Sequence, residues 1–147
     1  HRMVALQTVY QALGHLVERG MVPVLAHPER YSCCSPESVR WWKSTGALMQ
    51  VDATTLLSSR GRGERARQLI SHGLVDIAAA DNHGDDRSMA AVREALEPHG
   101  GGLQADLLAT LNPGAILADQ LTEDVPPLRM RASIVAQFRR IFQGEDE

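Results

Sequence analysis

The sequence contains little of what several classes of protein require. Its two cysteines, Cys33 and Cys34, are adjacent, and adjacent cysteines are badly placed to bridge one another in ordinary disulfide geometry. A disulfide-stabilised scaffold is therefore not indicated, and a reducing, cytoplasmic setting is expected. No apolar stretch approaches the roughly 20 residues of a membrane-spanning helix. The net charge of −3 provides no basic field for a phosphate backbone, so no nucleic-acid partner is predicted.

The remaining composition is ordinary for a globular chain. Hydrophobic residues make up 44% of the sequence and charged residues 22%. A length of 147 residues corresponds to about one domain and is sufficient to bury a core. The chain begins with His1-Arg2 and enters a helical pattern at once. We therefore expect it to be the downstream part of a longer protein.

Short apolar runs alternate with segments of helical periodicity. Strands are expected at residues 22–26, 47–51 and 74–80. This alternation predicts an α/β fold with a parallel sheet and right-handed crossovers. Three strands are too few to close a barrel, so the chain is expected to form part of a barrel or of an open sheet. Helices are expected at residues 4–19, 36–45, 64–72, 88–96, 103–110 and 112–117, with a mobile loop over 54–63.

The C-terminal segment departs from this pattern. After Pro126-Pro127, residues 128–142 combine four arginines with apolar residues at helical spacing, which predicts a basic amphipathic helix. Such a helix can make weak contact with a membrane surface, dock to a partner or a second copy in a homo-oligomer, or pack on its own domain. Packing on its own domain is favoured. We accordingly divide the chain into a domain over 1–125 and a tail over 126–147.

Metal-ligand residue types follow two of the expected strands. His27 comes directly after the first strand, and Asp81 and His83 follow the run that ends at Ala80. Because carboxyl ends of parallel strands meet at the same edge of a sheet, we expect these side chains to converge on one ion. Mixed imidazole and carboxylate ligation suits Mn²⁺, Fe or Zn²⁺ better than Ca²⁺ or Mg²⁺.

Two arginines accompany the predicted ligands. Arg30 lies three residues after His27, and Arg87 lies four residues after His83. A guanidinium group offers a planar fork that binds two oxygens of a phosphoryl group. The pattern therefore suits an anionic, phosphorylated substrate. Glu29, between His27 and Arg30, is interpreted as a structural carboxylate that bonds backbone amides or Arg30.

Several sequence segments occur in a characteristic order: Pro23 to Tyr31 (PVLAHPERY), Gln50-Val51, Gly73-Leu74-Val75, Ala80 to His83 (ADNH), Arg87 and Asn112-Pro113. Taken together, these segments resemble the bacterial PHP-domain tyrosine phosphatases of the CpsB/CapC type. The resemblance implies a distorted (βα)7 barrel, of which this chain is the C-terminal part, with up to three metal ions at the C-terminal ends of the strands. It implies removal of phosphate from tyrosines of a kinase that controls capsule or exopolysaccharide export. The resemblance extends to about Leu117.

Carried over by position, the resemblance implies metal-ligand roles for His27, Asp81 and His83. It implies that Arg30 and Arg87 are catalytic residues that bind or activate the phosphoryl group.

The sequence also departs from the family pattern. Thr55, a predicted substrate-binding residue, falls where the family commonly has serine, and Ala80 and Asn82 differ from the usual Ser-Asp-Ala-His. The N-terminal His-x-His ligands and the bridging carboxylates of the family have no counterpart in the chain. We therefore expect about half a metal site and weak metal binding.

The sequence thus predicts a metal-dependent phosphomonoesterase that acts on the phosphotyrosine tail of a kinase. Two alternatives stay open: a phosphatase for a small ester such as histidinol phosphate, and a non-catalytic remnant that binds a partner. A cysteine nucleophile is not predicted, because the residues five positions after Cys33 and Cys34 are Ser38 and Val39 rather than arginine.

Overall fold

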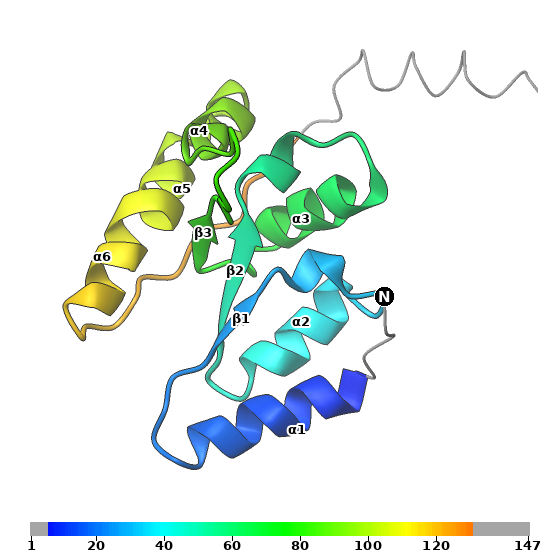
Figure 1. The fold of residues 1–147 in the computed structure, drawn as a ribbon, viewed down its shortest axis with the longest axis vertical. Coiled ribbons are helices and arrows are strands. Elements are labelled where there is room, and N and C mark those ends of the chain that lie inside the picture. The colour runs from blue at the N-terminus through cyan, green and yellow to red at the C-terminus, as the bar shows by residue number, and fades with distance from the viewer. Residues whose placement is uncertain (1–5, 131–147) are drawn as a thin grey trace, which may run out of the picture.

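Three parallel strands form the centre of the structure, a computed structural model that describes residues 6–130 (Figure 1). They are β1 (Val24–Ala26), β2 (Leu48–Asp52) and β3 (Ile77–Ala79), in the spatial order β1-β2-β3. Both pairings are parallel, and each strand is followed by a helix before the next begins. The predicted α/β fold with a parallel sheet is confirmed. The described residues form an open sheet in which β2 is the central strand.

The sheet register places three loops at one edge. Ala26 lies opposite Gln50, and Asp52 lies opposite Ala79, so β1, β2 and β3 end near one another. β1 and β3 are shorter than the strands expected at residues 22–26 and 74–80. Residues 22–23, 74–76 and 80 are not in regular β structure. The hydrogen bonding with β2 nevertheless begins one residue before β3, where the Asp76 amide donates to the Met49 carbonyl (2.9 Å).

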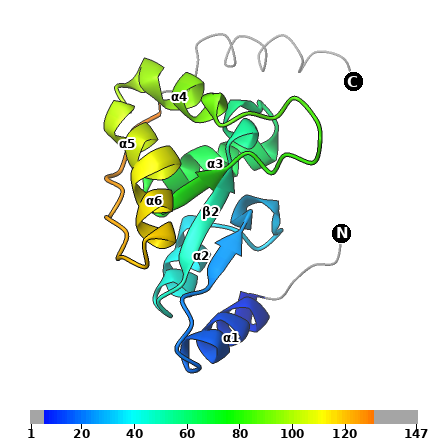
Figure 2. The same ribbon diagram turned by 60° about the vertical axis from the view of Figure 1, so that its left-hand side comes forward.

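The helices gather on two sides of the sheet. Figure 1 shows α1 and α2 next to β1, whereas α4, α5 and α6 form an arm next to β3. Figure 2 shows the same division from another direction. Ser35 caps α2 with a reciprocal Ser35–Ser38 capping box, and Pro36 occupies the first turn, as expected from the sequence. The helices are α1 (Leu6–Val17), α2 (Pro36–Lys43), α3 (Gly61–Ser71), α4 (Ala90–Leu96), α5 (Gly102–Asp106) and α6 (Asn112–Leu117).

The segment predicted as a mobile loop over 54–63 is instead structured. Residues Thr54–Leu57 form a 3₁₀ turn, and α3 begins at Gly61, three residues before the predicted start. The backbone of the turn packs directly against the backbone of α3 at Gly63. The approach is so close that a Cβ on this residue would lie 2.0 Å from the Ser58 carbonyl oxygen. Arg67 closes the same contact by donating to the carbonyls of Leu56 and Ser58. The glycines that suggested mobility permit close packing here.

The predicted break between two helices near residue 112 is a change of helix type instead. Residues 107–111 form a π-helical stretch between α5 and α6, so the chain stays helical from 102 to 117. Pro113, at the start of α6, has no amide hydrogen to donate back to this turn, which accounts for the irregular hydrogen bonding. Of the basic helix predicted over 128–142, residues 131–142 lie outside the described range.

The core lies between the sheet and the helices on both sides. Trp42, Met49, Leu69 and Leu108 are all essentially inaccessible to solvent. Leu128 is also buried, which ties the segment after α6 to the same core. None of the helices within residues 6–130 has the length and apolar content needed to cross a membrane.

Candidate active site

Asp81 is the centre of a cluster of charged side chains at the carboxyl edge of the sheet. Its Oδ1 lies 3.3 Å from Nε2 of His27 and 3.3 Å from Nε2 of His83. Its Oδ2 accepts hydrogen bonds from Arg30 Nη2 (2.7 Å) and Arg87 Nη1 (3.3 Å). The predicted convergence of residues 27, 81 and 83 is therefore found. The two predicted arginines join them on the opposite oxygen of the same carboxylate.

His27 is held in place from the central strand. Its backbone amide donates to the Gln50 carbonyl (2.8 Å), and the Gln50 side-chain amide lies 3.3 Å from His27 Nδ1. With Nδ1 engaged by Gln50, Nε2 is the nitrogen that faces Asp81. Because an amide nitrogen only donates, Nδ1 accepts this hydrogen bond, and Nε2 carries the ring hydrogen that points toward Asp81 Oδ1.

Two of the residues in the cluster have a strained backbone. His27 has φ 53° and Asp81 has φ 50°, both in the left-handed region that residues with a Cβ rarely adopt. Within residues 6–130, only Asp119 among the other non-glycine residues shares this feature. Each strained residue directly follows the end of a strand or comes two positions after it. Such strain concentrates at functional sites, where the surrounding structure maintains it.

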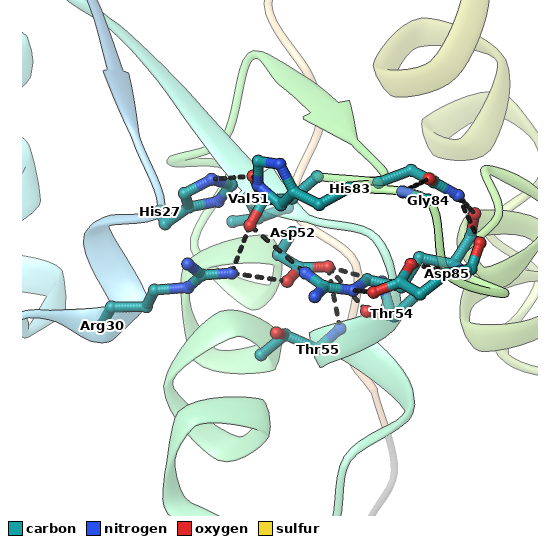
Figure 3. Close-up of polar contacts among 12 residues, drawn as sticks. His27, Arg30, Val51, Asp52, Thr54, Thr55, His83, Gly84 and Asp85 are labelled. Atoms are coloured by element: carbon teal, nitrogen blue, oxygen red, sulfur yellow. Dashed lines mark hydrogen bonds and ion pairs between the residues drawn. The ribbon is translucent and has the colours of Figure 1, made fainter.

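Asp52 is a member of the cluster that sequence reasoning missed. It ends β2, its side chain is 4% exposed, and its Oδ2 accepts from Arg30 Nη2 (2.9 Å). Its Oδ1 accepts from the Thr54 amide (2.9 Å), the Thr54 hydroxyl (2.8 Å) and the Thr55 amide (3.4 Å). Figure 3 shows Arg30 between this carboxylate and the 81–87 loop. A charged residue at the carboxyl end of a buried strand was the available signal.

Glu29 has the structural role predicted for it. The side chain is fully buried, and Oε1 accepts a hydrogen bond from the Asp52 amide (3.1 Å). Its Oε2 has no hydrogen-bond partner among the described residues. Burial raises the pKa of Glu29, with hydrogen bonds to backbone amides acting in the opposite direction.

The loop after β3 is organised by its own polar side chains. Asn82 donates to the carbonyls of Asp85 (2.7 Å) and Arg87 (2.8 Å) and accepts from the Gly84 amide (2.7 Å). Asp85 in turn accepts from Arg87 Nε (2.7 Å), which directs Nη1 of that arginine toward Asp81. The asparagine that departs from the family pattern thus shapes the loop. His83 stays 76% exposed at its tip.

Charge pairing sets the ionisation of the site. The hydrogen bond from Arg30 holds the pKa of Asp81 below its ordinary value. Burial alone would raise the pKa of Asp52, but hydrogen bonds from Thr54 and Arg30 outweigh it and the pKa is lowered. Burial likewise opposes the charged form of Arg30, and its two carboxylate partners reverse the effect and raise its pKa. The cluster therefore holds two anionic carboxylates and cationic arginines close together.

The donor set agrees in chemistry with a divalent ion but is incomplete in number. Two imidazole nitrogens reach one oxygen of Asp81, and mixed nitrogen and oxygen donors suit Mn²⁺, Fe or Zn²⁺. Across residues 6–130, however, no group of three or more His, Cys, Asp or Glu side chains is arranged so that it could hold a metal ion. The described residues thus do not by themselves enclose such a site.

A cysteine nucleophile is disfavoured by the structure rather than by spacing. Arg40 follows Cys34 with five residues between them, a separation that a phosphate-cradling loop can use. The Cys34 side chain is buried, however, and burial raises the pKa of its thiol to about 12. Arg40 is half exposed on α2 and pairs with Glu37. Because the thiolate is the nucleophilic form, this cysteine is unsuited to the chemistry.

A parallel α/β sheet with imidazole, carboxylate and guanidinium groups gathered at its carboxyl edge defines an α/β protein whose charged cluster lies where sites in this class of fold are found. The family model described as capsular polysaccharide synthesis, CpsB/CapC, matches residues 1–118. The chain belongs to this family. The matched range contains the whole of the cluster around Asp81.

Two relatives extend the comparison. The chain is 27% identical over 125 residues to the tyrosine-protein phosphatase CpsB of Streptococcus pneumoniae, covering 77% of this chain and 51% of the relative. Among solved structures, it is similar to a chain from the crystal structures of Bacillus subtilis YwqE and S. pneumoniae CpsB, described as unique metal-dependent tyrosine phosphatases. That match has a TM-score of 0.65 and 25% identity, and it covers 84% of this chain and 52% of the other. The chain spans about half the length of these relatives.

Proposed function

We propose that the chain supplies part of the active site of a metal-dependent protein-tyrosine phosphatase. One observation carries the proposal: His27, Asp81 and His83 meet two arginines at one edge of a parallel sheet. Family membership supports it, as do relatives named as tyrosine phosphatases. We further propose that the substrate is the phosphotyrosine tail of a kinase that regulates capsule or exopolysaccharide synthesis, and that the protein acts in the cytoplasm.

In this proposal the metal-ligand atoms are Nε2 of His27, Nε2 of His83 and Oδ1 of Asp81. Mn²⁺ is the first choice of ion, with Fe or Zn²⁺ as alternatives, and a site of up to three ions requires further ligands from outside residues 6–130. A bound divalent ion supplies Lewis-acid polarisation of the phosphoryl oxygens. As a ligand, His27 must present an unprotonated Nε2, so its ring hydrogen moves to Nδ1 and the Gln50 side chain presents its amide oxygen there.

Arg30 and Arg87 are proposed to bind the phosphoryl group. Both reach Asp81 Oδ2 from different loops, so their guanidinium groups face the same position. Hydrolysis forms a bond from a water oxygen to phosphorus and breaks the bond to the tyrosine oxygen, while negative charge is spread over the remaining oxygens. Fixed cationic donors stabilise that charge at no cost of reorganisation. Thr55, in the turn that Asp52 holds, is proposed to contact the substrate at the rim.

The central test measures turnover of a phosphotyrosine peptide, with added Mn²⁺, by the protein that carries this chain together with the ligands that the proposal requires from outside residues 6–130. We expect turnover that a chelator abolishes and that thiol alkylation leaves intact. His83→Ala should reduce it strongly, whereas His15→Ala, which removes an exposed histidine on α1, should not. Turnover that survives chelation, or that alkylation removes, would contradict the metal route. Absence of turnover in that protein at saturating Mn²⁺ would favour the non-catalytic alternative.

A second measurement addresses the substrate class. We expect kcat/KM to be higher for phosphotyrosine peptides than for histidinol phosphate. The site is formed by three surface loops, and His83 at its edge is largely exposed, which suits a phosphate presented on a polypeptide. The opposite ratio would assign the chain to the small-ester alternative.

A further inference from the structure

Arg30 is shared between two carboxylates that differ in their surroundings. Its Nη2 donates to Asp52 Oδ2 (2.9 Å) and to Asp81 Oδ2 (2.7 Å). The side chain of Asp52 is 4% exposed, and that of Asp81 is 18% exposed. The two acids arrive from the ends of neighbouring strands, β2 and β3. One guanidinium nitrogen thus links the central strand to the site loop.

Asp52 is the more firmly anchored of the two acids. Its Oδ1 accepts three hydrogen bonds from Thr54 and Thr55, which lock the carboxylate across the turn that follows β2. Its own backbone amide donates to the buried Glu29, the residue that immediately precedes Arg30. Asp52 therefore contacts the segment of Arg30 twice, once through the backbone and once through the side chain. Figure 3 shows the Asp52 carboxylate with Arg30, Thr54 and Thr55.

Asp81, in contrast, has several competing partners. His27 and His83 lie at one of its oxygens, and Arg30 and Arg87 lie at the other. If Asp81 serves as a ligand, as the proposed function requires, its negative charge is drawn away from the arginines. The contact between Arg30 and Asp52 does not depend on that change, because Asp52 touches neither histidine among the contacts of the described residues.

We propose that Asp52 is the positioning residue of the site. It holds Arg30 in place while the contact of Arg30 with Asp81 exchanges for a contact with a phosphoryl oxygen. Asp52 acts on the substrate only through Arg30. This inference rests on the proposed function for the identity of the anion that Arg30 receives.

The test is a double-substitution cycle on kcat/KM with a phosphotyrosine peptide. Asp52→Ala should lower kcat/KM by about 10- to 100-fold, the usual effect of removing a partner that orients a functional group. Asp52→Asn should have a smaller effect than Asp52→Ala, because its single amide oxygen can still accept from Arg30, although the contacts with Thr54 at the other oxygen are then lost. In an Arg30→Ala background, Asp52→Ala should cause little further loss, since residues that act as one unit are not additive. A purely structural role predicts additive losses, and additive losses would overturn the proposal.

A parallel measurement needs no turnover. Calorimetric binding of inorganic phosphate in Mn²⁺ buffer should be weakened equally by Arg30→Ala and by the double variant. Asp76→Asn is the matched control, because Asp76 is equally buried, pairs with a cation and accepts from a backbone amide, but lies at the other end of the sheet. It should lower the thermal midpoint without changing phosphate affinity.

The two measurements separate the inference from the function on which it rests. Phosphate binding with the predicted non-additivity, in a chain that hydrolyses no phosphotyrosine, would overturn the proposed function and retain the role of Asp52. Phosphatase activity with additive effects of Asp52→Ala and Arg30→Ala would retain the function and overturn the role. A folded wild-type chain that binds no phosphate would overturn both.

Discussion

The two ends of the parallel sheet both hold a buried aspartate paired with a cation, but they are built differently. At the amino end, Lys43 Nζ contacts both oxygens of Asp76 at 2.5 Å, and the Met49 amide donates to the same carboxylate (2.7 Å). Asn112 reaches the Asp76 carbonyl (2.8 Å) and joins the segment after α6 to the sheet. At this end the carboxylate of Asp76 pairs with one cation, Lys43, among the described residues.

At the carboxyl end the partners compete. Four basic or imidazole side chains contact the single carboxylate of Asp81, and the backbone of both His27 and Asp81 is strained. An end with dedicated partners contributes stability. An end with competing partners can exchange one of them for a ligand, and the carboxyl edge is where sites in parallel α/β folds lie. The difference between the two ends is therefore a difference between fixed and exchangeable contacts.

The largest effect that separates the two ends is expected from Arg30→Ala. Removing this donor should lower kcat/KM on a phosphotyrosine peptide by about 100- to 1000-fold, the typical effect of deleting a group that stabilises transition-state charge. Arg93→Ala is the matched control, since Arg93 lies on α4 and pairs with Glu97 (3.1 Å), away from the site. Equal losses of kcat/KM in the two variants would show that Arg30 has no particular role in turnover.

The reverse pattern is expected from Lys43→Met at the amino end. It leaves Asp76 buried without its cation, which should lower the free energy of unfolding by about 3 kcal/mol. Urea denaturation followed by circular dichroism measures this change. Phosphate affinity below the unfolding transition should stay as in the wild type. A variant that unfolds like the wild type would contradict the assignment of this pair to stability.

A smaller effect, on stability, is expected from Gly63→Ala, at the contact between α3 and the turn that follows β2. In Gly63→Ala the added methyl group would meet the Ser58 carbonyl at 2.0 Å and separate α3 from the turn that carries Thr55. The cost should be about 2 kcal/mol. Gly14→Ala in α1 has nothing within 4 Å and should instead stabilise the chain by about 0.5 kcal/mol. Thermal unfolding of the two variants gives the comparison, and a neutral Gly63→Ala would refute the close approach.

The smallest effect concerns pH and the buried thiol beside the site. Because the pKa of Cys34 is raised from 9.0 to about 12, its contribution to stability is complete below pH 9 and is lost as the pH rises toward 12. The wild type should therefore lose about 1 kcal/mol between pH 8 and pH 10 relative to Cys34→Ala. Denaturation at the two pH values measures this, and parallel stability curves would show that the thiol is not shielded.

Much of the site could be predicted from residue types and their order. Apolar runs followed directly by His27 and by Asp81 predicted two loops at one edge, because parallel strands place their carboxyl ends together. Ser35 and Pro36 correctly marked the start of α2. The loop over 54–63 was misjudged, because glycines that permit mobility also permit backbone contact. Asp52 was missed, because its importance depends on residues that are distant in sequence. It pairs with Arg30, 22 residues away, and Arg30 also pairs with Asp81, which is 29 residues from Asp52.

The sequence by itself determined the α/β class, the parallel order of the strands and the residue types available at the carboxyl edge, because these depend on local periodicity and on chain direction. Only the tertiary structure decided that Arg30 is divided between Asp52 and Asp81, that Cys34 is buried, and that Lys43 neutralises Asp76 at the other end. The physical reason is range. Periodicity acts over a few residues, whereas the ionisation and pairing of a charge depend on every group that folding brings within a few ångströms.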